Sequence, residues 1–66
     1  MAVLKVIEVL ANSTKSWEDA AQNAVTEASK TLRGIESVYI KEMTAKVDAN
    51  LITEYRVNVK ITFLVD

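Results

Sequence analysis

The residues from Leu51 to Val65 carry the pattern that most constrains the fold. Every second residue in this stretch is apolar or aromatic, with one Thr, and the residues between them are mostly polar. Alternation with a period of two predicts one long strand with a buried face and a mostly polar face. Typical strands have about 5–6 residues, so this strand is longer than one helix can cover. We therefore expect part of it to be covered by another copy of the chain or by a ligand.

The length and composition of the chain also favour an oligomer. We predict a single domain over residues 1–66, and a domain of that size buries only about 60% of the surface of its unfolded chain. Such domains usually rely on disulfides, metals or oligomerisation. The chain has no Cys and no His, which excludes disulfides and the common zinc sites. Oligomerisation remains, and a hydrophobic content of 50% supplies apolar surface for it.

The sequence also narrows the class of function. A net charge of -1 gives no basic field for nucleic acid. The first apolar run, Ala2–Leu10, contains Lys5 and Glu8 and is too short to span a membrane. With no signal peptide expected either, we predict a soluble, cytoplasmic protein. Without His or Cys there is no conventional nucleophile–base pair, and a single Gly excludes a Gly-rich phosphate loop, so we do not expect an enzyme.

The first half of the chain predicts a strand and a helix. Ala2–Leu10 is rich in β-branched residues and is typical of a strand covered on both faces, and a polar connection over 11–15 follows. Ser16 is the expected N-cap of a helix over 17–33, with Asp19 reaching back as in a capping box. Gly34 is placed where a residue with positive φ would end that helix. The apolar stripe of the helix is mostly Ala, so it can approach a sheet closely.

The second half predicts a hairpin. The extended run from Ile35 to Asp48 meets the last strand through a turn at 48–51, where Asp and Asn are favoured turn residues. If Asp48 pairs with Leu51, then Val38 faces Ile61 and Ile40 faces Val59. On the other face the expected pairs are Ser37 with Thr62, Tyr39 with Lys60, Lys41 with Asn58, and Met43 with Arg56. The fold class is therefore α+β, in the order β-α-β-β, with a three-stranded antiparallel sheet wrapped on one helix.

This register assigns the two faces of the sheet. We expect the helix to cover one face, formed by Val38, Ile40, Val57, Val59, Ile61 and Phe63. We expect Ser37, Tyr39, Arg56 and Asn58 on the opposite face.

The order and spacing of these elements resemble the dodecin family over essentially the whole chain. The matching strings are Lys5-Val6-Ile7-Glu8-Val9, Ser13, Ser16-Trp17-Glu18-Asp19-Ala20-Ala21, Thr31-Leu32-Arg33 and Tyr55-Arg56-Val57. Dodecins are hollow homododecamers, and many bind flavins. The resemblance thus implies that neighbouring subunits shield the long strands, which the strand pattern requires independently.

The resemblance also implies a ligand site, in altered form. In flavin-binding members a Trp stacks on the flavin ring and a Gln bonds its edge, and these positions are Ser37 and Arg56 here. Ser offers no stacking surface, although Tyr39, two residues on, could partly replace it. Some members place Arg where this chain has Thr44 and Leu64. The implied cofactor is therefore a weakly bound flavin (FMN or riboflavin), or calcium, since members without the Trp include calcium binders.

Each candidate residue also has a structural interpretation. Trp17 is expected to pack on the sheet or on a neighbouring subunit rather than on a flavin. Arg56 could bind a phosphate or carboxylate through its bidentate fork, or pair with Glu54 or Glu42. Tyr39 could instead cap a sheet edge or an interface.

The carboxylates Glu36, Glu42, Asp48 and Glu54 are expected to be mostly solvated, and the position of any metal site is unknown. Two hypotheses follow. One is a homo-oligomeric protein that binds and stores a small ligand. The other is a shell that binds a cation or is purely structural.

Overall fold

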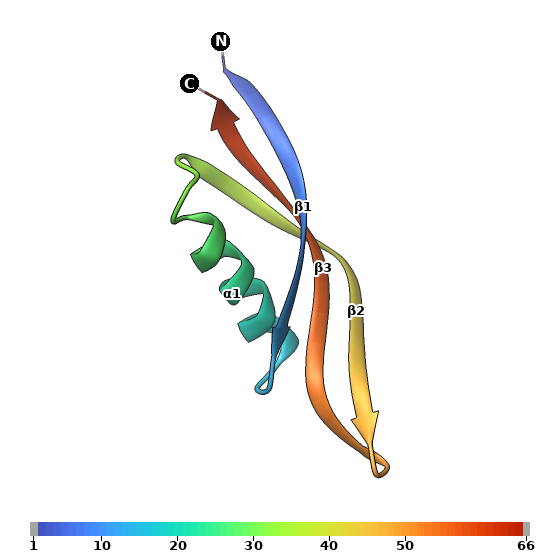
Figure 1. Cartoon of the computed structure of the whole chain (residues 1–66). Coiled ribbons are helices and arrows are strands. Elements are labelled where there is room, and N and C mark those ends of the chain that lie inside the picture. Colours follow the sequence, from blue (N-terminus) through green and yellow to red (C-terminus); the bar gives the residue numbers. More distant parts are fainter. Residues whose placement is uncertain (1, 66) are drawn as a thin grey trace.

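The computed structural model describes residues 2–65 and shows a β-α-β-β chain (Figure 1). Its elements are β1 (Val3–Ser13), α1 (Trp17–Ala28), β2 (Ile35–Asp48) and β3 (Leu51–Val65). The three strands form one antiparallel sheet in the order β1-β3-β2, so the expected fold class is confirmed. No helix in the described part of the chain is long and apolar enough to cross a membrane.

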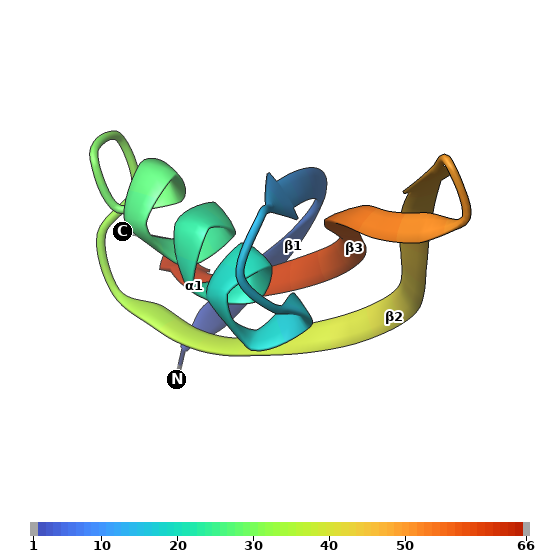
Figure 2. The same ribbon diagram turned by 90° about the horizontal axis from the view of Figure 1, so that it is seen from below.

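The core forms where α1 lies against the central strand. Three Ala side chains of α1 pack against three β-branched residues of β3, and all six are buried. These residues are Ala20, Ala21, Ala24, Val57, Val59 and Ile61. Small Ala side chains let the helix approach the sheet closely, as the sequence predicts. Figure 2 shows α1 lying within the bend of β2.

The helix begins as predicted and ends early. The Ser16 hydroxyl accepts a hydrogen bond from the Asp19 N–H at 3.0 Å, which confirms the N-cap. The reciprocal half of the capping box is wrong, because the Asp19 carboxylate instead accepts from the Ser13 hydroxyl at 2.6 Å. Asp19 therefore links the connection between β1 and α1 in two ways: its carboxylate bonds to the Ser13 side chain, and its backbone N–H bonds to the Ser16 side chain.

The predicted end of the helix at residue 33 is also wrong. After Ala28 the Lys30 and Thr31 N–H groups bond to carbonyls three residues back, which tightens the last turn. The Ser29 hydroxyl donates to the Thr26 carbonyl. Gly34 does have a positive φ of 67°, but it leads into β2 rather than capping the helix.

Strand β1 is longer and less covered than the sequence indicates. The segment Ala11–Ser13, expected in a connection, continues the ladder with Val57–Tyr55 of β3. The long partner strand supplies backbone hydrogen-bonding groups, which override the weak strand propensity of Ala-Asn-Ser. Cover on both faces is wrong for the single chain, because Leu4, Val6 and Leu10 of this edge strand are more than half exposed.

The register of the hairpin is as expected over Ser37–Ile40 and again at Val47 and Asp48, and it is shifted by one residue over Glu42–Lys46 between them. Ser37, Val38, Tyr39 and Ile40 pair with Thr62, Ile61, Lys60 and Val59 as expected. Lys41 is then an extra residue in β2, so that Glu42 pairs with Asn58, Met43 with Val57 and Thr44 with Arg56. The expected pairs Lys41–Asn58 and Met43–Arg56 are therefore wrong. A β-bulge inserts one residue into one strand and changes which side chains lie on each face.

The hairpin closes through the predicted turn. Asp48 pairs with Leu51, and Ala49 and Asn50 both have positive φ, which is typical of a two-residue type I′ turn. The tip projects beyond α1 in Figure 1. Val38 and Ile40, expected beneath the helix, are 37% and 38% exposed. One helix does not cover the full width of the sheet.

Candidate functional site

The face of the sheet away from α1, here called the open face, carries the predicted site residues. Val57, Val59 and Ile61 are buried on the helix side, so Arg56, Asn58 and Lys60 of β3 project to the other side. Cross-strand partners share a face. Ser37 and Tyr39 pair with Thr62 and Lys60, and both therefore lie on the open face. The predicted sidedness of Ser37, Tyr39, Arg56 and Asn58 is confirmed.

One chain does not bring Ser37 and Arg56 together. Ser37 pairs with Thr62, whereas Arg56 pairs with Thr44. Thr62 lies six positions beyond Arg56 along β3, which corresponds to about 20 Å along an extended strand. A single small ligand that contacts both positions would need them from two different copies of the chain.

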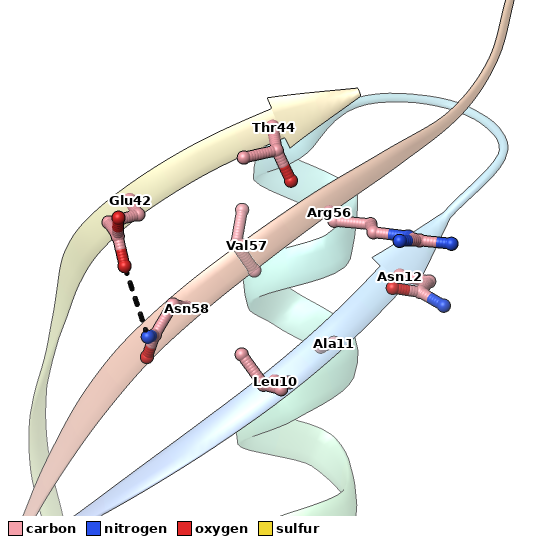
Figure 3. Close-up of a pocket in the computed structure, with 8 residues that line it drawn as sticks. All are labelled: Leu10, Ala11, Asn12, Glu42, Thr44, Arg56, Val57 and Asn58. Atoms are coloured by element: carbon pink, nitrogen blue, oxygen red, sulfur yellow. Dashed lines mark hydrogen bonds between the residues drawn. The ribbon is translucent and has the colours of Figure 1, made fainter. Parts of the chain in front are cut away.

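The open face is hollowed around Arg56. The hollow has a volume of about 500 Å³ and lies over all three strands (Figure 3). Its lining residues are Leu10, Ala11, Asn12, Glu42, Thr44, Arg56, Val57 and Asn58. Hollows that bind small molecules typically measure about 300–1,000 Å³, so this one has the size of a ligand site.

Six of the lining residues form two rows of paired residues, with the Ala11–Val57 pair between the rows. Asn12, Arg56 and Thr44 form one row, since Asn12 and Thr44 both pair with Arg56 from either side. Leu10 and Glu42 pair with Asn58 in the same way and form the second row. Figure 3 shows the Arg56 guanidinium beside Asn12 and the Glu42 carboxylate beside Asn58.

Arg56 makes the expected ionic contact with Glu54, but the distance between the two groups is long. Its Nε lies 3.7 Å from Oε1 of Glu54, and the Arg56 side chain is 52% exposed. At that distance the pair is an ionic contact rather than a hydrogen bond. Glu42, the other expected partner, accepts a hydrogen bond from Nδ2 of Asn58 at 3.4 Å. Arg56 is therefore accessible from the hollow.

A second charged group lies next to the hollow on the same face. The bulge residue Lys41 places its Nζ 3.5 Å from Oε2 of Glu8 on β1. The Asn58 amide and then the Lys41 ammonium, with a smaller contribution from Lys60, hold the pKa of the Glu8 carboxyl below its ordinary value. Glu8 therefore stays charged at neutral pH and balances the positive charge of Lys41.

The two aromatic candidates lie outside the hollow. The Trp17 indole N–H donates to the Thr44 carbonyl at 2.8 Å. Its ring meets Tyr55 edge-on, with centroids 4.9 Å apart. This confirms that Trp17 packs on the sheet. Tyr39 is 63% exposed on the open face, near Ser37 rather than near Arg56.

The carboxylates do not form a metal cluster in one chain. Among residues 2–65 no group of three or more His, Cys, Asp or Glu side chains is placed to hold a metal ion. Glu42 and Glu54 each interact with a neighbour on β3. Hard cations such as calcium take about 6–8 oxygen ligands, so a cation site would have to combine oxygens from several copies.

Sequence reasoning missed part of the hollow. Local composition places Asn12 in a connection, and regular alternation without a bulge at Lys41 brings Glu42 to Arg56 only as a possible ion-pair partner and does not bring Thr44 beside it. One signal was available. Apolar residues of the second extended run fall at even positions, Val38 and Ile40, and then at the odd position Met43, which is the change of parity that a bulge produces.

Comparison with known proteins shows the family. The dodecin family model matches residues 3–66, and the chain belongs to the dodecin family. A protein named calcium dodecin, from Mycobacterium tuberculosis, is 33% identical over 63 residues, which are 96% of this chain and 89% of that protein.

Solved dodecins have the same fold. A mutant of the Thermus thermophilus dodecin is 29% identical with a TM-score of 0.94, and covers 100% of this chain and 98% of its own. The dodecin of Streptomyces coelicolor is 26% identical with a TM-score of 0.93, over 98% and 93%. The calcium dodecin of M. tuberculosis, described as having a novel calcium-binding site, is 31% identical with a TM-score of 0.84, over 97% and 91%.

Proposed function

We propose that this dodecin is a non-catalytic, cytoplasmic protein that binds and stores a small ligand on the open face of a homo-oligomer. The dodecin resemblance supports twelve subunits. The observation that carries the proposal is the position of Ser37 and Arg56. They lie on the same face, but about 20 Å apart in one chain. A ligand that uses both positions therefore lies between subunits.

The flavin site in this proposal is degenerate. The Ser37 side chain has no ring to stack on an isoalloxazine, and an aromatic pair contributes about 0.5–1.5 kcal/mol beyond the area it buries. The Arg56 guanidinium only donates hydrogen bonds, whereas the amide of Gln both donates and accepts. We therefore propose that FMN or riboflavin binds weakly, with Ser37, Tyr39 and Arg56 around it.

Restoring the two family residues tests the flavin site. Ser37→Trp should tighten riboflavin binding about tenfold, because it returns an aromatic platform, and adding Arg56→Gln should tighten it further. Quenching of riboflavin fluorescence measures both. Gln22→Trp, at an exposed position on α1, controls for quenching by any added indole. Tight binding by the unmodified protein, or no gain in the double variant, would contradict the proposal.

Calcium is the second candidate ligand, favoured by the calcium dodecin relative and by oxygen atoms in the hollow. Glu42 supplies a carboxylate and Asn58 an amide there, both suitable for a hard cation. If copies of these groups bind calcium, the ion should raise the melting temperature, an excess of chelator should reverse the rise, and Glu42→Gln should abolish it. An unchanged melting temperature at millimolar calcium would exclude this candidate.

A further inference from the structure

We propose that the hollow around Arg56 binds small organic anions, with a phosphate or carboxylate head on the row Asn12–Arg56–Thr44. This inference rests on the proposed function and names the chemical class of its ligand. It differs from a site for a neutral flavin ring, because the charge of Arg56 selects the head group.

The row Asn12–Arg56–Thr44 places three hydrogen-bond donors side by side across the sheet. Arg56 carries a guanidinium, Asn12 an amide NH₂ and Thr44 a hydroxyl, and the three belong to three adjacent strands. Adjacent strands are about 4.8 Å apart, so the outer two residues lie on either side of the Arg56 backbone, and the guanidinium extends toward Asn12. A carboxylate or phosphate can take two bonds from the Arg fork and further bonds from its neighbours. Figure 3 shows Asn12 and Thr44 on either side of Arg56.

The positive charge in the hollow has only a weakly held partner, so it is open to an anionic ligand. Arg56 is the only cationic side chain among its lining residues, and Glu42 is the only anionic one. Glu42 already accepts a hydrogen bond from Asn58. The contact between Arg56 and Glu54 is 3.7 Å long, with the Arg56 side chain half exposed and the Glu54 side chain partly exposed, and surface pairs of this kind contribute only about 0–1 kcal/mol. A bidentate ligand can therefore replace Glu54 at little cost.

The size of the hollow indicates an organic ligand. A volume of about 500 Å³ is much larger than an inorganic ion needs. Leu10, in the second row, is 77% exposed and provides an apolar surface next to the donors. The geometry therefore fits an anionic head on Arg56 and an apolar or aromatic body against Leu10.

Three probes with one aromatic ring each test the head group. Phenyl phosphate, benzoate and benzyl alcohol carry a phosphate, a carboxylate and a neutral hydroxyl, and ligand-observed NMR titration of the intact protein gives their affinities. At least one anion should bind the wild type, and benzyl alcohol should bind at least tenfold more weakly. The stronger anion identifies the head group as phosphate or carboxylate. Equal binding of all three, or binding of none, would overturn the inference.

Matched variants locate the site. Arg56→Gln should weaken the anion about tenfold or more, since hydrogen bonds to charged groups contribute about 1.5–3 kcal/mol. Lys60→Gln removes the same charge from the same face but outside the hollow, and should leave binding nearly unchanged. Equal losses in both variants would show a general charge effect and overturn the inference.

The same variant separates this inference from the proposed function. Arg56→Gln should weaken the aromatic anion while it tightens riboflavin in the Ser37→Trp background. If riboflavin binding improves and the anion is unaffected, the inference fails and the proposed function stands. If the anion responds and riboflavin never binds, the anion site stands and the flavin part of the proposed function fails.

Discussion

Gly34 is the residue whose backbone conformation most limits substitution. It has φ of 67°, and a Cβ at this position would lie 3.1 Å from Cβ of Leu64. Its carbonyl also accepts a hydrogen bond from the Leu64 N–H at 3.0 Å. The sequence predicts the positive φ of the single Gly, but not that it joins the start of β2 to the end of β3.

Replacing Gly34 should therefore destabilise the protein. Gly34→Ala places a side chain in the left-handed region, at a cost of about 1–2 kcal/mol, and against Leu64. We expect a lower melting temperature in a thermal scan at fixed protein concentration. Ala49→Gly is the matched control, because Ala49 already has φ of 49° and Gly removes that strain. The account would be contradicted if the two variants melted alike.

At the residue scale, the sequence predicts which face of the sheet each site residue lies on, but it is less successful at predicting which residues each one contacts. Alternation together with the Asp48–Leu51 turn is enough to place Ser37 and Arg56 on one side of the sheet. Their separation along β3 follows from the register, and the partners of Arg56 depend on the bulge. The hydrogen bond from Ser13 to Asp19 also depends on how β1 meets α1, which local propensity does not contain.

At the scale of elements, long regular patterns were predictable and their interruptions were not. The limits of β2 and β3 and the start of α1 follow from alternation, turn residues and the Ser16 cap. The early end of α1 follows from 3₁₀-type bonds at Lys30 and Thr31, which compete with a helical pattern that continues in the sequence. The extension of β1 to Ser13 depends on the length of its partner strand.

The bulge at Lys41 shows how one extra residue builds a site. It moves Glu42 and Thr44 to the open face, where they pair with Asn58 and Arg56. It also moves Met43 to the helix side, where it pairs with Val57. Without it the residue opposite Arg56 would be apolar. The composition of the hollow is therefore a consequence of strand irregularity, a device that β-sheets commonly use near functional sites.

At the scale of the whole molecule, the single chain leaves much of its apolar surface uncovered. It is elongated, with dimensions of 51 × 20 × 13 Å, and the hairpin extends beyond the helix. Large apolar residues are more than half exposed on every strand, including Leu4, Met43, Val47, Leu51 and Ile52. Exposed apolar surface of this extent is typical of a protein interface, as the length of the last strand predicts.

The mass of the particle in solution tests the central claim, that copies of this chain complete one another and their ligand sites. Light scattering coupled to size exclusion, at low micromolar protein, measures it directly. Twelve chains of 7.3 kDa predict a particle of about 88 kDa that persists on dilution. A mass of one or two chains at that concentration would contradict the account.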